Sequence, residues 1–226
     1  MPIWIEEVRW ASHQDVLQSI RHAVFIIEQG IDPADEWDHR DATCRHFLGY
    51  LDNTPVGCAR LLDGRTIGRM AVLDSARGQH VGSRLLLACL TAIRATQATA
   101  VLGAQISAMP FYALHGFQPD GPIFDDAGIP HRRMTLNTQS PYQICPVKRS
   151  PVSLTVQLSG PTTNIPLTFQ TETAHWQLRL PAMDAHTESW LTPRLICLAE
   201  CFQANRLTLF TPAGPVQVAF DGSACC

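Results

Sequence analysis

The stretch IGRMAVLDSARGQHVGS, residues 67–83, decides the fold of this chain. It begins as an apolar strand, continues through a short loop that carries Arg77, Gly78 and Gly82, and enters an apolar helix expected to begin at Ser83. The exposed backbone N–H groups at a helix N-terminus bind phosphate, and glycine lets a phosphate approach the backbone closely. The stretch therefore predicts a strand–loop–helix unit that holds a phosphate group.

An ordinary connection between a strand and a helix is the alternative interpretation of this loop. It lacks GxxxxGK followed by Ser or Thr, the pattern that binds nucleoside triphosphates, and it lacks GxGxxG, the pattern that binds dinucleotides. Neither class of nucleotide is therefore the expected ligand.

Length and composition limit the possible classes of protein. With 226 residues, 46% of them hydrophobic, the chain can form one large domain or one domain with a smaller one. The net charge of −3 predicts neither a nucleic-acid partner nor attraction to anionic lipid. The eight cysteines include no CxxC pair, so no metal site is expected.

The N-terminus and the hydropathy predict a cytoplasmic protein. The first ten residues, MPIWIEEVRW, lack the basic start and apolar core of a signal peptide. No apolar run approaches the roughly 18 residues that a membrane span needs. No membrane partner is therefore expected.

Hydrophobic periodicity predicts alternating strands and helices over the first 140 residues. Ser12 is expected to cap a helix that ends near Glu28, and a polar, acidic segment follows at 29–45. The buried face of that helix is expected to hold Val16, Ile20, Val24 and Ile27. Strands are expected at 3–9, 46–51, 56–62, 66–73, 100–104, 117 onward and 131–136. The remaining helices are expected at 83–96, with Leu85, Leu86, Cys89, Leu90 and Ile93 inward, and from a Ser107 cap to a left-handed Gly116.

A change in composition near residue 140 predicts a second domain. Residues 141–226 hold nine of the 16 prolines but only 10 of the 37 charged residues. Pro141, Pro146 and Pro151 are interpreted as a stiff connector between a domain at 1–140 and a small α+β module at 150–226. Its elements are expected to be strands at 153–158, 165–170, 176–180, 206–211 and 216–220, and a helix at 191–204. Pairing between edge strands of two copies of this module could form a homodimer. The sequence does not predict the role of the module.

Several short motifs of the first domain occur together in one known family. Arg77 and Gly82 match the loop pattern Q/R-x-x-G-x-G/A, with His80 in place of its first glycine, and His tolerates the left-handed region that such a position requires. The other motifs are Arg21, Val24-Phe25, Glu28-Gln29, an acidic loop with Glu36, Asp38 and Asp41, His46, residues 102–105, Phe111-Tyr112, Gly116-Phe117 and residues 128–131. Over about residues 3–138 the chain resembles the Gcn5-related N-acetyltransferase (GNAT) superfamily, in particular its ElaA-type bacterial subgroup.

The resemblance implies an α/β (α+β) fold, with a mixed, mostly antiparallel sheet flanked by helices. It also implies acetyl-CoA as acyl donor, with the pantetheine arm held between splayed fourth and fifth strands. Backbone groups of Met70 and Val72 would pair with that arm, and the Val72 amide would polarise the thioester carbonyl. The residues expected to bind the cofactor are Met70, Ala71, Val72, Arg77, Gly78, Gln79, His80, Val81, Gly82, Ser83 and Gln105.

Two groups are expected to move protons. Amine attack on a thioester expels a thiolate, and the resemblance places the phenol of Tyr112 beside that sulfur as the acid. The alternative is a half-buried tyrosine that bridges helix and sheet. An amine with a pKa near 10.4 arrives protonated and must lose a proton. The candidate bases are Glu28, which is preferred, and Glu36, Asp38, His46 and His131. As an alternative, the carboxylates solvate a loop and the histidines form hydrogen bonds within the sheet. The acidic loop could instead attract a cationic amine.

The expected reaction is transfer of an acetyl group from acetyl-CoA to a primary amine, by direct attack in a ternary complex. The acceptor is expected to be a small molecule or a peptide. A non-catalytic acyl-CoA-binding module with a regulatory role is the alternative, and the unexplained C-terminal residues keep it open.

Overall fold

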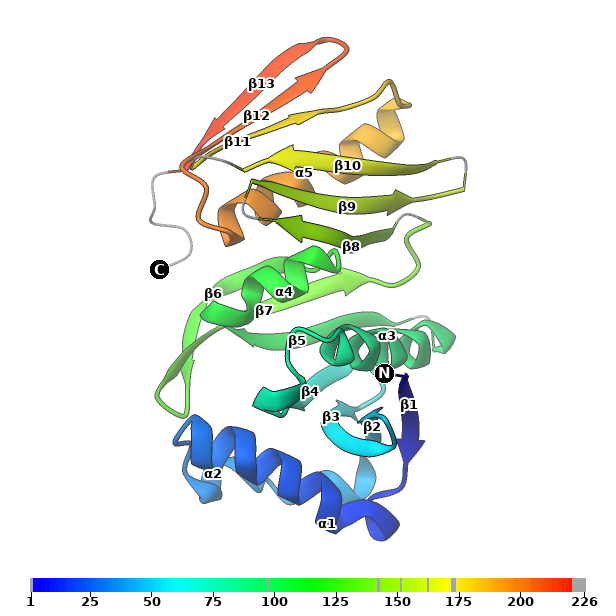
Figure 1. Ribbon diagram of the computed structural model, residues 1–226, viewed down its shortest axis with the longest axis vertical. Helices are drawn as coiled ribbons and strands as arrows, with labels where there is room; N and C mark the ends of the chain where they lie inside the picture. Colours follow the sequence, from blue (N-terminus) through cyan, green and yellow to red (C-terminus); the bar gives the residue numbers. More distant parts are fainter. Residues whose placement is uncertain are drawn as a thin grey trace. The chain divides into compact units, whose positions relative to one another are not determined.

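The computed structural model describes residues 2–96, 98–141, 143–150, 152–161, 163–171 and 174–220 (Figure 1). The chain forms two compact units. The first contains Met1–Gly103, Phe124–Pro130 and Asn137–Gln139, and the second contains Ala104–Ile123, His131–Leu136 and Ser140–Cys226. The expected domain boundary at 140–150 stays a prediction.

The first sheet has seven strands in the order β1-β2-β3-β4-β5-β7-β6. Strands β1 to β4 pair antiparallel with their neighbours, whereas β4 and β5 pair parallel. The expected mixed sheet is therefore present. Its strands are β1 (Ile3–Val8), β2 (Arg45–Leu51), β3 (Thr54–Leu62), β4 (Thr66–Val72), β5 (Thr99–Gln105), β6 (Gln118–Asp126) and β7 (Ile129–Asn137).

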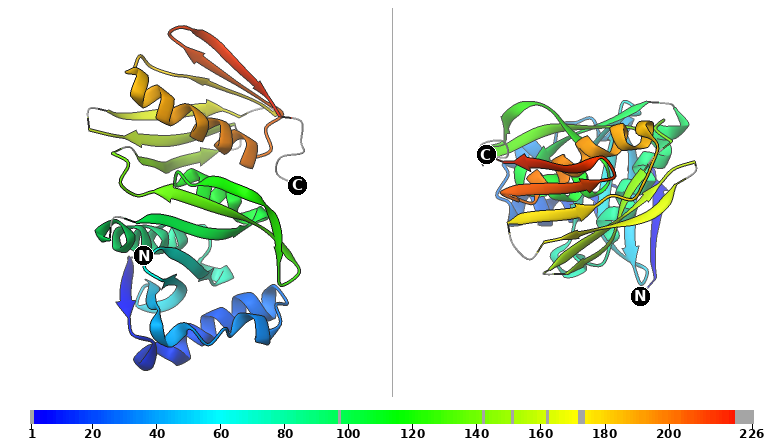
Figure 2. Two further views of the ribbon diagram at one scale, coloured as in Figure 1. Left: turned by 180° about the vertical axis from the view of Figure 1, so that it is seen from behind. Right: turned by 90° about the horizontal axis from the view of Figure 1, so that it is seen from above.

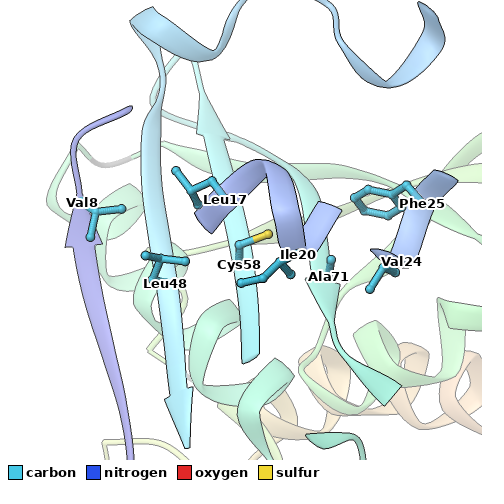
Figure 3. Packing of buried hydrophobic residues seen from close by; sticks show 8 residues of the cluster. All are labelled: Val8, Leu17, Ile20, Val24, Phe25, Leu48, Cys58 and Ala71. Atoms are coloured by element: carbon cyan, nitrogen blue, oxygen red, sulfur yellow. The ribbon is translucent and has the colours of Figure 1, made fainter. Parts of the chain in front are cut away.

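The first helical segment covers one face of strands β1 to β4. It consists of α1 (Trp10–Arg21) and a π-helical stretch, η1 (His22–Glu28). Ser12 does not cap it, because the helix already begins at Trp10 after Arg9; the Ser12 hydroxyl instead donates to the Arg9 carbonyl, at 3.3 Å. Figure 3 shows the resulting core, formed by Val8, Leu17, Ile20, Val24, Phe25, Leu48, Cys58 and Ala71.

The π-helical stretch changes which residues of this helix are buried. Ile27, expected on the buried face, is 70% exposed, whereas Phe25 is buried. Hydrogen bonds that span five residues widen the turn, so side chains after His22 leave the spacing of an α-helix. Glu28 ends this stretch, and the acidic segment that follows forms α2 (Pro33–Glu36) and the short turn η2 (Asp41–Thr43).

Helix α3 (Val81–Ala95) lies on the other face of the same strands and begins two residues before the expected Ser83. The five inward residues expected from the sequence, Leu85, Leu86, Cys89, Leu90 and Ile93, are all buried. Val81 also faces the sheet, where its Cγ1 would lie 2.9 Å from a Cβ at Gly49 and 3.2 Å from one at Gly57. These two glycines let the first turn of α3 approach the sheet closely.

Replacement of Gly57 by Ala is expected to destabilise the fold by about 1–3 kcal/mol, the cost of overpacking a core. The added Cβ would lie 3.0 Å from the Ala71 carbonyl oxygen and 3.1 Å from Leu85 Cδ1, so backbone and helix must both move. Urea denaturation measures the change. Gly68→Ala in β4 is the matched control, because its Cβ meets nothing within 4 Å; equal losses in both variants would contradict the close-approach argument.

Helix α4 (Met109–Leu114) belongs to the second unit and follows a short turn, η4 (Ile106–Ala108). Ser107 lies inside that turn and does not cap α4, whose N-terminal flanking residue is Ala108. Gly116 has φ +85°, which confirms the expected left-handed end of this helix.

The second sheet has six strands in the order β13-β12-β11-β10-β9-β8, with α5 (Ala185–Cys201) across one face (Figure 2). The strands are β8 (Gln143–Ser150), β9 (Ser153–Ser159), β10 (Asn164–Gln170), β11 (His175–Arg179), β12 (Arg206–Thr211) and β13 (Gly214–Ala219). Within the second unit, α4 packs against α5 and β8. The expected α+β character is confirmed.

Two expectations for this region are wrong. The stretch marked by Pro141, Pro146 and Pro151, expected to be a stiff connector, contains strand β8, in which Pro146 is tolerated because β8 is an edge strand. Pro151 lies outside the described residues. Helix α5 begins six residues before Leu191, because Asp184 caps it through the Thr187 N–H, at 2.8 Å. No helix in the described part of the chain is both long enough and apolar enough to cross a bilayer.

Candidate active site

The loop between β4 and α3 presents a row of backbone donors. It runs through the short turn η3 (Asp74–Ala76), then Gly78 at φ +74° and His80 at φ +63°. Within the described ranges, no acceptor binds the backbone N–H groups of residues 78–82. Because these groups precede and begin a 15-residue helix, they form the kind of site that binds an anionic group.

His80 replaces the glycine of the loop pattern without changing the backbone conformation that the pattern requires. Its φ of +63° and ψ of +9° lie in the left-handed region, as the sequence predicts for a histidine at this position. Its side chain is exposed.

Arg77 and Glu28, expected to act as cofactor ligand and base, contact each other. Arg77 Nη1 and Nη2 donate to Glu28 Oε1 and Oε2, both at 2.7 Å. Arg77 Nε also donates to the Val72 carbonyl, at 3.1 Å. The hydrogen bonds from Arg77 lower the pKa of Glu28, which makes the carboxylate a weaker proton acceptor.

The acidic segment is held against the sheet by buried ion pairs, which we call the Arg21 cluster: Arg21, Glu36, Asp38, Asp41, Arg60 and Arg69. Arg21 is 1% exposed; its Nε donates to Glu36 Oε1, and its Nη1 to Asp41 Oδ1 at 2.8 Å. Arg60 Nη1 reaches Asp38 at 2.7 Å and Asp41 at 2.9 Å. Arg69 Nε lies 2.8 Å from Glu36 Oε2.

This cluster engages three candidate bases: Glu36, Asp38 and His46. Hydrogen bonds from Arg60 hold the pKa of Asp38 well below its ordinary value. His46 Nε2 donates to the Asp41 carbonyl, at 2.8 Å, and burial lowers the pKa of its ring. The structure thus favours the interpretation that these groups bond within the fold. His131, the remaining candidate, lies half-buried on β7.

Strands β4 and β5 separate soon after they pair. The ladder joins Thr66 to Val101 and Ile67 to Leu102; no further pair with β5 occurs along the described part of β4. The expected splay is therefore present beside Met70, Ala71 and Val72. Met70 and Val72 are half-buried, whereas the Ala71 side chain packs in the core of Figure 3. The Ala71 backbone faces β3, because Ala71 pairs with Cys58 and Leu73, two residues on, donates its N–H to the Val56 carbonyl. Ala71, expected to bind the cofactor, is therefore turned away from the splay, and Met70 and Val72 direct their backbone groups towards it.

Tyr112 and Gln105 belong to the second unit. Tyr112 lies half-buried on α4, and its ring packs edge-on against Phe111 and Phe117, at centroid distances of 5.0 and 5.9 Å. Gln105 ends β5 and is also half-buried. The aromatic contacts fix the Tyr112 ring, and replacement by phenylalanine would keep the part of the side chain that packs.

Stability is expected to fall as pH drops, because of His115 at the end of α4. Burial lowers the pKa of His115 to about 4, against about 6.5 in an unfolded chain. Between pH 4 and pH 6.5 the His115 ring binds a proton more readily in the unfolded state than in the folded state. The stabilising contribution of neutral, buried His115 is therefore fully present above pH 6.5 and is lost as the pH falls towards 4. Urea denaturation at pH 7 and at pH 4.5 measures the decrease in the free energy of unfolding between these values. In His115→Gln this decrease should be about 2 kcal/mol smaller than in wild type. Parallel curves for the two proteins would contradict this.

The sequence analysis does not identify Gly49 and Gly57, which allow the start of α3 to pack closely on the sheet. It also does not predict the ion pair between Glu28 and Arg77. Glycines at facing positions of neighbouring strands were the available signal, since Gly49 pairs with Gly57. Nothing local in the sequence joins residues 28 and 77, which are 49 positions apart.

Comparisons with known proteins agree with this geometry. The Acetyltransferase (GNAT) domain family matches residues 23–138. An uncharacterized N-acetyltransferase of Bacillus subtilis (strain 168), YjcF, is 35% identical over 120 residues, 51% of this chain and 86% of that protein. Protein ElaA of Escherichia coli (strain K12) is 34% identical over 125 residues, 51% of this chain and 81% of its own length.

Two solved structures share the fold of the matched region. The crystal structure of Escherichia coli ElaA is 30% identical, with a TM-score of 0.53, and the match covers 59% of this chain and 99% of that one. An acyl-CoA N-acyltransferase from Pseudomonas aeruginosa is 26% identical, with a TM-score of 0.54 and the same coverage. The chain is an acyltransferase that belongs to the GNAT acetyltransferase family, with further residues after the family domain.

Proposed function

We propose that this protein transfers an acetyl group from acetyl-CoA to a primary amine. The observation that carries the proposal is the row of backbone N–H groups at residues 78–82, which no acceptor in the described ranges engages. A diphosphate accepts hydrogen bonds and carries negative charge, so a helix start with exposed donors suits it. The left-handed conformations of Gly78 and His80 set the direction in which these N–H groups point.

The proposed chemistry forms a carbon–nitrogen bond and breaks a carbon–sulfur bond. Acetyl-CoA supplies the thioester carbonyl and the thiolate leaving group. The Tyr112 hydroxyl donates its proton to that thiolate, an assignment that rests on the Phe111-Tyr112 motif and the family match. Along the splayed edge of β4, the backbone of Met70 and Val72 is proposed to hold the pantetheine arm.

The proton of the attacking ammonium must leave before or during attack. The sequence predicts Glu28 as its acceptor, but the paired Glu28 has a lowered pKa. The proposed function therefore does not depend on Glu28, and water can take this proton. The cytoplasmic location and a homodimer stay predictions.

A thiol-release assay tests the proposal. Full-length protein is mixed with acetyl-CoA and a panel of amines: a peptide N-terminus, a lysine peptide, a polyamine and an aminoglycoside. We expect release of CoA thiol that depends on at least one amine, and mass spectrometry should find the acetylated amine. Tight CoA binding without turnover on any amine would favour the non-catalytic, regulatory module instead.

A further inference from the structure

The Arg77 side chain is engaged by the protein. A guanidinium has five N–H donors. Arg77 uses one on the Val72 carbonyl, two on the Glu28 carboxylate at 2.7 Å each, and one on Asp74 Oδ1 at 3.4 Å. Two carboxylates thus face one guanidinium, so the local charge at this point is negative. A diphosphate that approached the Arg77 guanidinium would be repelled by the Glu28 and Asp74 carboxylates, which already contact it.

The Glu28 side chain projects from a well-anchored backbone. Backbone hydrogen bonds continue past it, from Gln29 N–H to the Val24 carbonyl five residues back, at 3.1 Å, and from Ile31 N–H to the Phe25 carbonyl six residues back, at 2.9 Å. Val24 and Phe25 are buried in the core of Figure 3. The Glu28 carboxylate therefore projects from a backbone that the core holds in place.

The loop that follows Arg77 has few side-chain hydrogen bonds of its own among the described contacts. Gly78 and His80 both have positive φ, and the described contacts include one other side-chain bond within the loop, from Gln79 Nε2 to the Ser75 carbonyl. Arg77 directly precedes the row of N–H groups at 78–82. Its bonds to Glu28 and Val72 join the end of η1, the end of β4 and the start of this row.

We propose that Glu28 and Arg77 act as one positioning pair, which holds the backbone donors of residues 78–82 ready for the diphosphate. Arg77 is then a positioning residue and not a diphosphate ligand, and Glu28 is a positioning residue and not the base. The inference rests on the proposed function, since it concerns the same loop. The pair is 40% and 42% exposed, and an exposed ion pair adds little to stability, so its effect falls on binding.

The test measures CoA binding by calorimetry for full-length wild type, Glu28→Gln, Arg77→Met and the double variant. Each single change is expected to weaken binding by up to about fivefold, the scale of an exposed ion pair. The double variant should bind no more weakly than Arg77→Met, because loss of the Glu28 carboxylate has no further effect once Arg77 is removed. Binding of S-acetylpantetheine, which lacks the diphosphate, and the melting temperature should change little in all of them.

Arg40 and Asp63 provide the matched control, since they form an exposed ion pair at 3.2 Å away from this loop. Asp63→Asn should leave CoA affinity unchanged. If Glu28→Gln bound CoA as tightly as wild type or more tightly, while Arg77→Met bound it more weakly, Arg77 would be a direct ligand. This result would contradict the proposed positioning pair. A fall in kcat alone in Glu28→Gln would make Glu28 the base and also overturn it. Wild-type protein that binds no CoA would instead sink the proposed function.

Discussion

Tyr112→Phe is expected to lower kcat for acetyl transfer by about 10²- to 10⁴-fold, the usual contribution of a positioned acid. The substitution removes only the hydroxyl, and the ring keeps its edge-on contacts with Phe111 and Phe117. CoA affinity should therefore stay within about twofold of wild type.

Tyr50→Phe is the matched control for this change. Tyr50 is a half-buried tyrosine of β2 whose hydroxyl donates to Glu6 Oε2, at 3.1 Å, and whose ring stacks on Trp4. It should retain full kcat. If Tyr112→Phe retained full kcat as well, the phenol would not be the acid, and a packing role on α4 would be the correct interpretation.

The second large effect is expected at the Arg21 cluster. Arg21→Met should reduce the free energy of unfolding by about 3 kcal/mol, because removal of the most buried partner leaves two buried carboxylates with one guanidinium each, Arg69 at Glu36 and Arg60 at Asp41. Glu36 and Asp41 would both lose a guanidinium, and the packing of Arg21 over the Trp37 ring would be lost. Urea denaturation at pH 7 gives the change directly.

Arg45→Met tests the same chemistry at the surface. Arg45 makes two bonds to the Glu7 carboxylate, at 2.6 and 2.7 Å, but both side chains are nearly half exposed. Exposed pairs contribute about 0–1 kcal/mol, so this variant should stay close to wild type. A loss below about 1 kcal/mol for Arg21→Met would contradict a stabilising role for the cluster.

The features that the sequence predicted correctly depend on local physics. The periodicity of residues 83–96 predicted the buried face of α3, and the tolerance of histidine for positive φ predicted the conformation of His80. Alternating residues predicted most strands of both sheets, and Gly116 predicted the end of α4. In each case one residue type or one period decides the local structure.

The features that it missed depend on contacts between distant segments. Side-chain periodicity cannot distinguish a π-helix from an α-helix before the helix packs, so Ile27 was placed on the wrong face. Acidic residues at 36, 38 and 41 look like a solvated loop until Arg21, Arg60 and Arg69 surround them. Likewise, Glu28 and Arg77 were given separate roles because nothing near either residue reveals its partner.

The central claim is that the backbone N–H groups of residues 78–82 bind the diphosphate of CoA. Titration of ¹⁵N-labelled protein with CoA, followed by amide NMR, tests it directly. We predict that these five amides show the largest downfield shifts, and that S-acetylpantetheine leaves them nearly unmoved. Saturable CoA binding that shifts amides elsewhere and leaves residues 78–82 unchanged would contradict the account.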